Sequence, residues 1–385
     1  MESEEARLIM FDPVQFEPLG GICVSAQDQA HSLSIMRALG QWCDEMTVSR
    51  FVTIGPLKFQ GTLLVHIQAN ALLHECAPEA DMRQLAANLG FSTTGTEYEL
   101  VREIFLSKAI SPIASSFPSL DELFAAIRIR RNVALIARRT ELWFSIDEDT
   151  RPTTHWKKLT SDGFALIPGQ SLPRALEVAL CPDTSGQRYG FACRQASEYL
   201  MLAGLVQELE ATNPQLLEAI EKRWADTPIR GESFIDAFLM ERGSRERPFP
   251  KHHYVPGSRI WFKNPDEHST DVDGFEGSWV VYMGAGKFVN LWDRAEPYPI
   301  EIKCLEIYHW RHCVEHSASG ALRMNEDRVK EMVDQSMADA SAKEKILNQM
   351  MEYRAPVGVY GEGGCIDLTR EHARWVCPQT TNIVI

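Results

Sequence analysis

Cys193 is the residue whose type and placement most directly suggest chemistry. It stands immediately before residues 194–209, where apolar residues recur at three- and four-residue spacings. This pattern predicts an amphipathic helix that begins at the cysteine. Unpaired backbone N–H groups and the helix dipole stabilise a thiolate at such a position, and Arg194 adds a positive charge. Cys193 is therefore a candidate nucleophile, and a buried core thiol is the alternative interpretation.

Histidines are the other candidates for chemistry. His309, His312 and His316 are spaced so that one helical face carries all three. If one of these histidines folded back towards Cys193, it would supply a base. Surface or packed histidines are the default interpretation. No C-x-x-C pair accompanies them, so we expect no metal. The glycine run at 361–364 lacks the lysine and hydroxyl of a phosphate loop, so we expect no cofactor.

Helices and short strands alternate before Cys193. Ser119 and Glu122 have the spacing of a capping box, which predicts a helix that runs to about Arg139. Short strands are expected next, and then a short helix that Pro173 opens. The expected strands are residues 142–146, 154–159 and 164–167, and the expected helix is residues 173–180.

Strands dominate after a further helix at 214–224. Aromatic and β-branched residues at 260–262, 279–283 and 288–292 predict three strands, and Gly284-Ala285-Gly286 predicts a hairpin turn between the last two. Residues 325–353 are expected to form a charged helical stretch, and residues 357–360 a closing strand. This order of elements indicates an α+β fold.

Pro112 and the serine-rich turn that follows it mark a domain boundary. The first ~110 residues mix apolar strand-like segments with helical stretches. We therefore predict an N-terminal extension of unknown role over residues 1–112 and a second domain over residues 113–385.

The composition is that of an ordinary globular protein: 44% of the 385 residues are hydrophobic, and the formal net charge is −14. This charge disfavours nucleic acid and anionic membranes as partners. The nine cysteines are scattered and odd in number, so reduced thiols are expected. Residues 1–5 are acidic, unlike a signal peptide, and no window reaches the roughly 18 apolar residues of a membrane span. We expect a soluble, cytoplasmic protein.

Residues 119–293 resemble the small spore-coat-type bacterial transglutaminases. The likeness is most specific at Tyr189-Gly190-Phe191-Ala192-Cys193, which is similar to the family's tyrosine-x-phenylalanine-x-cysteine segment, and at the phenylalanine-lysine-asparagine-proline run of residues 262–265. The resemblance implies a papain-like (NlpC/P60-like) core with Cys193 as the nucleophile. It also implies a reaction on a protein or peptide substrate. The thiolate attacks a glutamine carboxamide, ammonia leaves, and an amine donor takes the acyl group from the thioester.

The chain departs from this family at the acid/base positions. The family's glutamate before the cysteine falls on Ala192, its glutamate before the hairpin on Ser278, and its histidine after the hairpin on Leu291. None of these three residues can act as the expected base.

Two hypotheses follow from this departure. In the first, the site has been rebuilt: Glu276 and Asp293 stand two positions from Ser278 and Leu291, which on a strand places them on the same face. Asn290 would then orient a substrate amide. In the second, catalysis has been lost and the core survives as a binding module for a protein or peptide. The candidate site residues are therefore Cys193, Glu276, Asn290 and Asp293.

Overall fold

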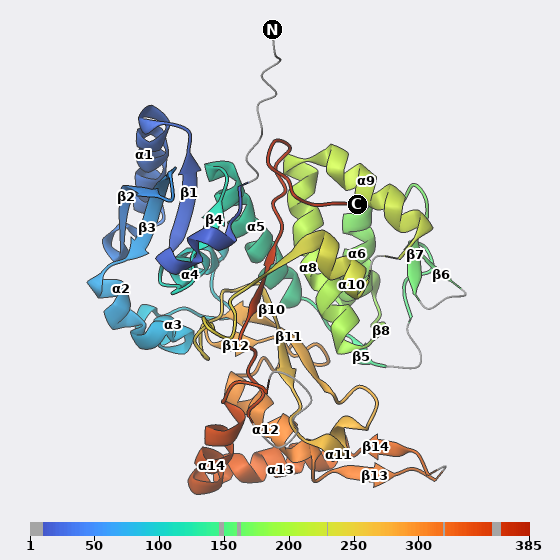
Figure 1. The fold of residues 1–385 in the computed structure, drawn as a ribbon. Helices are drawn as coiled ribbons and strands as arrows, with labels where there is room; N and C mark the ends of the chain where they lie inside the picture. Colours follow the sequence, from blue (N-terminus) through green and yellow to red (C-terminus); the bar gives the residue numbers. More distant parts are fainter. Residues whose placement is uncertain (1–10, 146–149, 160–162, 229, 319, 356–362) are drawn as a thin grey trace.

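The structure is a computed structural model that describes residues 11–145, 150–159, 163–228, 230–318, 320–355 and 363–385. It contains both helices and strands, and Figure 1 shows them in three groups: an N-terminal sheet with its helices, a helical group around α8, and a set of C-terminal helices.

The N-terminal group is built on a four-stranded sheet in the order β2-β3-β1-β4. β1 pairs antiparallel with β3 and parallel with β4. The strands are β1 (Ile22–Ala26), β2 (Val52–Phe59), β3 (Thr62–Ala69) and β4 (Ser115–Phe117). β4 lies just past the expected boundary at Pro112, and the division into residues 1–112 and 113–385 stays a prediction.

Helices cover this sheet. α1 begins after Asp28, whose side chain accepts the N–H of His31, and α4 begins with a complete capping box of Thr96 and Glu99. The helices of this group are α1 (Gln29–Glu45), α2 (Ala71–Cys76), α3 (Met82–Leu89) and α4 (Glu97–Ala109). Three short 3₁₀ segments accompany them: Val14–Leu19, Ser49–Phe51 and Pro78–Ala80.

α5 (Leu120–Ala137) begins where the sequence predicts it, after Ser119, whose side chain accepts the N–H of Glu122. The other half of the predicted capping box is wrong. The Glu122 carboxylate accepts the backbone N–H groups of Val376 and Cys377 instead, at 3.1 and 2.8 Å. The start of α5 therefore anchors the C-terminal segment.

α8 (Cys193–Thr212) packs along α5. The two helices approach closely at Gly204, where a Cβ atom would lie 2.3 Å from Val133 Cγ2. Shorter elements surround this pair. They are β5 (Trp143–Phe144), β6 (Trp156–Lys158), β7 (Phe164–Leu166), α6 (Leu172–Leu180), α7 (Pro182–Ser185), β8 (Gly190–Phe191), α9 (Pro214–Asp226) and α10 (Glu232–Phe238).

An antiparallel sheet of β10 (Ser258–Lys263), β11 (Gly277–Gly284) and β12 (Lys287–Phe288) follows. The strand predicted at 288–292 is wrong beyond Phe288. The Asn290 side-chain oxygen accepts the N–H groups of Trp292 and Asp293, both at 3.2 Å, and this turns the chain. Leu291 and Asp293 therefore do not alternate along a strand as the sequence argument assumed.

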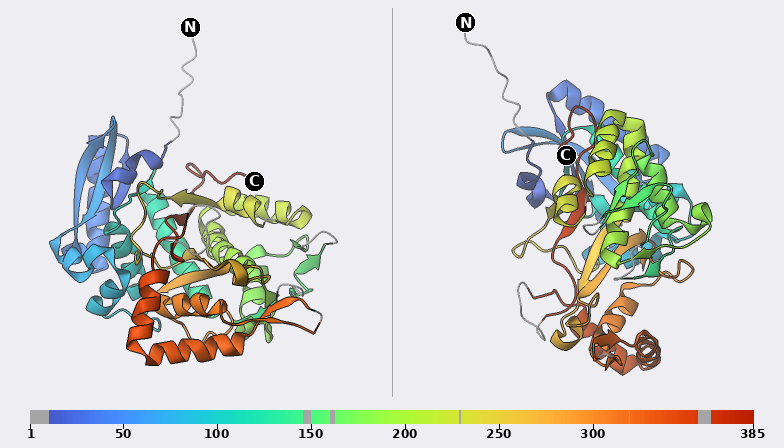
Figure 2. Two further views of the ribbon diagram at one scale, coloured as in Figure 1. Left: turned by 60° about the horizontal axis from the view of Figure 1, so that its bottom comes forward. Right: turned by 90° about the vertical axis from the view of Figure 1, so that its right-hand side faces the viewer.

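The C-terminal helices lie together at one end of the molecule (Figure 2). The charged helical stretch predicted over 325–353 consists of two helices, because the Asp339 side chain accepts the N–H groups of Ser341 and Ala342 and starts a new helix. The elements are α11 (Glu267–Thr270), α12 (Ile300–Trp310), β13 (Val314–His316), β14 (Leu322–Met324), α13 (Glu326–Ala338) and α14 (Ala340–Met350).

The histidines predicted to share one helical face do not do so, because α12 ends at Trp310 and His316 lies on β13. The closing strand predicted at 357–360 falls outside the described residues. The chain returns to the centre through β15 (Arg370–Ala373), which pairs antiparallel with β9 (Leu239–Arg242). Among the helices that the structure describes, none is long and apolar enough to cross a membrane.

Candidate active site

Cys193 is the first residue of α8, and β8 leads directly into it. β8 pairs in parallel with β5. The Arg151 guanidinium stacks on the Phe191 ring, 3.3 Å from its centroid, and donates to the Gly190 carbonyl at 2.7 Å. These contacts hold residues 189–193 in place and so fix the path of the chain as it enters α8.

Arg259, on β10, ties α8 to the strands. Its side chain is fully buried, its Nε donates to Ser197 Oγ at 2.8 Å, and its Nη1 donates to both carboxylate oxygens of Glu371 at 2.8 Å. The guanidinium also lies 3.5 Å from the centroid of the Trp279 ring. The first turns of α8 and the middle of β11 are thus held by one buried cation.

Asn264 holds the segment that precedes β11. Its backbone N–H donates to the carbonyl of Glu276 at 3.0 Å, and its side-chain Nδ2 donates to the carbonyl of Phe275 at 2.9 Å. The phenylalanine-lysine-asparagine-proline run therefore has a structural role: it holds the segment that leads into β11.

Cys193 lines a cavity of about 580 Å³. Residues of β11, of the turn after β12, and of α12 and α13 complete its wall. The lining includes Ser278 and Leu291, the positions on which the resemblance places the family's second glutamate and its histidine. Both positions thus share a wall with the cysteine, and neither carries a group suited to proton transfer.

Cys193 is partly exposed as a residue, but burial of its thiol raises the pKa above the ordinary value. The backbone N–H of Trp279, the ammonium of Lys303 and the backbone N–H of Arg194 lower the pKa, and the Glu276 carboxylate raises it. Because burial is the largest of these effects, the neutral thiol predominates at neutral pH.

Two of the predicted residues lie in the turn after β12 and line the cavity: Asn290 and Asp293. The Asn290 side-chain oxygen is engaged by the turn, and Asp293 Oδ1 accepts the N–H of Ala295 at 3.0 Å. Glu276 is exposed just before β11, and its Oε1 accepts the N–H of Gly274 at 3.4 Å. The structure therefore gathers Cys193, Asn290 and Asp293 around one cavity and leaves Glu276 outside its lining.

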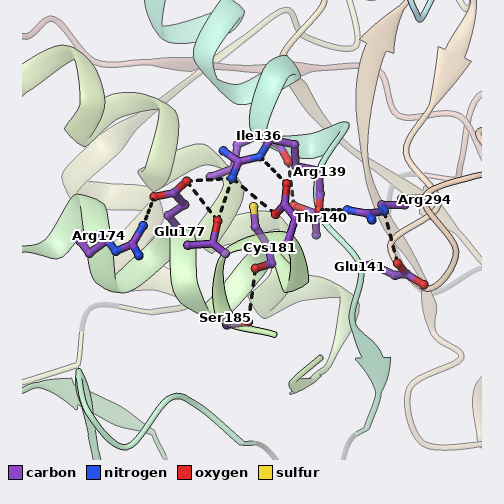
Figure 3. Close-up of polar contacts among 11 residues, drawn as sticks. Ile136, Arg139, Thr140, Glu141, Arg174, Glu177, Cys181, Ser185 and Arg294 are labelled. Carbon is purple, nitrogen blue, oxygen red and sulfur yellow. Dashed lines mark hydrogen bonds and ion pairs between the residues drawn. The ribbon is translucent and has the colours of Figure 1, made fainter. Parts of the chain in front are cut away.

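The residue after Asp293 anchors this turn. The Arg294 guanidinium lies 3.4 Å from Glu141 Oε2 and donates to the carbonyl of Arg139 at 3.4 Å. Figure 3 shows Arg294 and Glu141 beside the end of α5, where Arg139 also pairs with Glu177 of α6. The cavity wall that carries Asn290 and Asp293 is thus fixed to the helices around α8.

Sequence reasoning missed an ion pair in the cavity. Lys303 and Glu306, on α12, lie 2.6 Å apart between Nζ and Oε2, and Lys303 Nζ is 4.8 Å from the centroid of the Tyr298 ring. All three residues line the cavity. Burial opposes charge on Lys303, but Glu306 and Tyr298 outweigh it and hold the Lys303 pKa above its usual value. Burial raises the pKa of Tyr298 to about 12.

Acidic side chains dominate the ionisable lining of the cavity, which contains two lysines, Lys303 and Lys330. The carboxylates are those of Asp293, Glu296, Glu306, Glu326, Asp327 and Asp334. This excess of negative charge attracts cations to the cavity. No histidine of the described residues lines it, so the base suggested for the histidines at 309–316 does not come from there. Within the same described residues, no group of three or more histidine, cysteine or acidic side chains is arranged to hold a metal ion.

Comparison with known proteins agrees with the motifs around Cys193. The family model of the protein-glutamine gamma-glutamyltransferases matches residues 81–369, well over half of the chain. A transglutaminase from Geobacillus stearothermophilus, in a structure without its C-terminal extension, aligns at 18% identity and a TM-score of 0.37 over 56% of this chain and 98% of that one. A search of curated proteins returns no match. The family match includes Cys193, the β10-β11-β12 sheet and α12, and the chain therefore belongs to the protein-glutamine gamma-glutamyltransferase family.

Proposed function

We propose that the protein transfers the acyl group of a protein or peptide glutamine side chain to a primary amine, through a thioester on Cys193. The supporting observation is the placement of the cysteine at the head of α8, on a cavity that also holds the Lys303–Glu306 ion pair. In this proposal α8 and the β10-β11-β12 sheet form a papain-like core.

The proton of the thiol moves first. Lys303 is already charged, so it accepts the thiol proton only as it gives one of its own to Glu306, 2.6 Å away. The products of this step are a Cys193 thiolate, a Lys303 ammonium and a neutral Glu306. The ammonium then stabilises the thiolate, as it already lowers the Cys193 pKa. The pair thus does the work of the glutamate and histidine that Ser278 and Leu291 replace.

The thiolate attacks the carbonyl carbon of the glutamine side chain, and the carbon–nitrogen bond breaks. The proton stored on Glu306 returns through Lys303 to the leaving nitrogen, which departs as ammonia. A primary amine next attacks the thioester, its extra proton passes back to the pair, and the thiolate is released. The acidic lining draws in the amine as its ammonium form, which gives up one proton to solvent water before its nitrogen attacks the thioester.

The predicted polar residues take supporting roles in this scheme. Asn290 offers its Nδ2 to the substrate amide, because its oxygen is engaged in the turn. Asp293 binds the incoming ammonium at the cavity wall. Glu276 acts through its charge alone, which disfavours the thiolate.

The test follows incorporation of a labelled primary amine into a glutamine-rich protein, together with release of ammonia. Cys193→Ala abolishes both products in this proposal. Lys303→Met and Glu306→Gln each lower the rate by about 10²–10⁴-fold, the usual worth of proton transfer. Lys330→Met is the matched control, because Lys330 is an exposed lysine on the same cavity. Equal losses in the Lys330 and Lys303 variants contradict the assignment.

A binding module without catalysis is the second candidate. The raised pKa of Cys193 and the leucine at position 291 favour it. It predicts neither product, and an iodoacetamide reaction of Cys193 no faster than that of a model thiol. It also predicts that glutamine-containing peptides bind equally well to Cys193→Ala. Ammonia release without amine incorporation would instead identify a deamidase.

A further inference from the structure

A buried cluster of cations lies away from the Cys193 cavity, where five elements meet. Lys108 of α4 is 2% exposed, and Arg130 of α5 and Arg242 of β9 are each 5% exposed. His372 of β15 and the hydroxyls of Ser115 and Ser116 on β4 line the same place. Figure 1 shows β4 and α4 in the N-terminal group, with α5 beside them.

The charges of this cluster are not balanced by the carboxylates that the structure describes. Arg242 Nη1 lies 3.7 Å from Glu17 Oε1, and this is the one ion pair that the cations of the cluster make with the described residues. Lys108 Nζ donates to the neutral hydroxyl of Ser115 at 3.3 Å, and Arg130 Nη1 to that of Ser258 at 2.8 Å. A buried cation without a counter-charge is strongly unfavourable.

Two small cavities, of about 20 and 10 Å³, flank Lys108. Lys108, Ser115 and His372 line both of them. Ser116 Oγ is buried against the larger one and has no hydrogen-bond partner among the described residues. Since a cavity of roughly 10–15 Å³ accepts one water molecule, this space suits a small ion and excludes a nucleotide.

We propose that this cluster binds a small inorganic oxyanion of the phosphate class. The ammonium of Lys108 and the guanidinium of Arg130 supply its counter-charges, and the Ser116 hydroxyl donates the hydrogen bond that it does not make within the protein. Such donors make strong charge-assisted hydrogen bonds to phosphate oxygens. Burial, with Arg130 and Arg242 nearby, lowers the pKa of Lys108 well below its usual value, and a bound anion opposes this effect.

The position of the site gives the anion a structural consequence. Lys108 and Ser116 belong to the N-terminal sheet and its helix α4, whereas Arg130, Arg242 and His372 belong to α5, β9 and β15. A bound oxyanion therefore joins the N-terminal sheet to the elements that hold α8. This inference does not depend on the acyl-transfer proposal, because the larger of the two cavities shares no lining residue with the Cys193 cavity.

The experiment uses the full-length protein, isothermal titration calorimetry and thermal unfolding, with phosphate, sulfate or chloride added at constant ionic strength. Phosphate and sulfate are expected to bind once per chain and to raise Tm in a saturable way. Ser116→Ala keeps the Tm measured without phosphate and weakens binding. Lys108→Met, which removes a charged donor, weakens phosphate binding at least about tenfold. Lys58→Met, at an exposed lysine of β2, leaves binding unchanged.

Three results would overturn the proposal. One is the absence of any saturable effect of phosphate or sulfate. Another is an equal effect of chloride, which would show salt screening only. The third is unchanged phosphate binding in both Lys108→Met and Ser116→Ala. Alkylation of Cys193 with iodoacetamide is the remaining control. Phosphate binding to the cation cluster must survive alkylation, whereas binding that is lost would take place in the Cys193 cavity.

Discussion

Glu103 couples α4 to the turn between β11 and β12, and its ionisation makes the stability of that contact depend on pH. The carboxylate accepts the N–H of Ala285 at 2.9 Å and the hydroxyl of Tyr282 at 3.1 Å. Its side chain is buried, at 2% exposure. Burial raises the pKa of Glu103 from the ordinary 4.5 of a glutamate to about 7, although the two hydrogen bonds lower it.

The sign of the pH effect follows from this raised pKa. The folded protein holds the proton of Glu103 more tightly than the unfolded chain does, so the contribution is fully present below pH 4.5 and is lost as the pH rises through 7. With these two pKa values, the free energy of unfolding falls by about 2–3 kcal/mol between pH 5 and pH 8 on account of this group alone.

Glu103→Gln removes this titration while keeping a similar shape. We expect the unfolding free energy of the variant to rise by about 2–3 kcal/mol relative to that of the parent protein between pH 5 and pH 8, whatever their difference at pH 5. Urea unfolding at both pH values measures this. Glu75→Gln, at an exposed glutamate, is the control and should show no such change. A variant whose difference from the parent stays constant within about 0.5 kcal/mol refutes the argument.

Three further predictions concern the elements that position Cys193. Gly204→Ala should lower the free energy of unfolding by up to about 3 kcal/mol, because its Cβ would meet α5 backbone atoms at 2.8 and 2.9 Å. An alanine variant as stable as the parent protein in urea unfolding would contradict this close approach of the helices. Arg259→Met should cost about 3–5 kcal/mol by leaving Glu371 without its cation, and calorimetry would detect this. Lys303→Met should raise the apparent pKa of Cys193, measured from the pH dependence of its reaction rate with iodoacetamide, because the Lys303 ammonium lowers this pKa. A pH profile that does not shift in the variant would exclude this effect of Lys303.

Local patterns in the sequence predicted the elements that position Cys193. α8 begins at Cys193 because an apolar periodicity starts there, and β10 and β11 lie where aromatic and β-branched residues cluster. The break at Asp339 also had a local signal, because aspartate is a strong helix cap. That residue was readable as the start of a second helix.

The remaining errors come from contacts that no local pattern contains. Glu122 leaves its capping box to bind backbone groups of the C-terminal segment, more than two hundred residues away. Asn290 ends β12 through its own side chain, where the apolar run up to Trp292 favoured a longer strand. Lys303 and Glu306 have the ordinary spacing of an ion pair on a helix surface. Their place in the wall of the Cys193 cavity depends on how α12 packs, which the local sequence does not show.

In the proposed mechanism a lysine–glutamate pair takes the part of a histidine, and this changes what catalysis requires. A histidine is a base near neutral pH by itself. Lys303 stays charged and accepts a proton only while Glu306 receives one, so in the proposed relay neither residue works without the other. The double variant Lys303→Met/Glu306→Gln should therefore be about as slow in amine incorporation as either single variant, because residues that act as a unit are not additive. Losses that multiply in the double variant would show two independent roles and would rule out the relay.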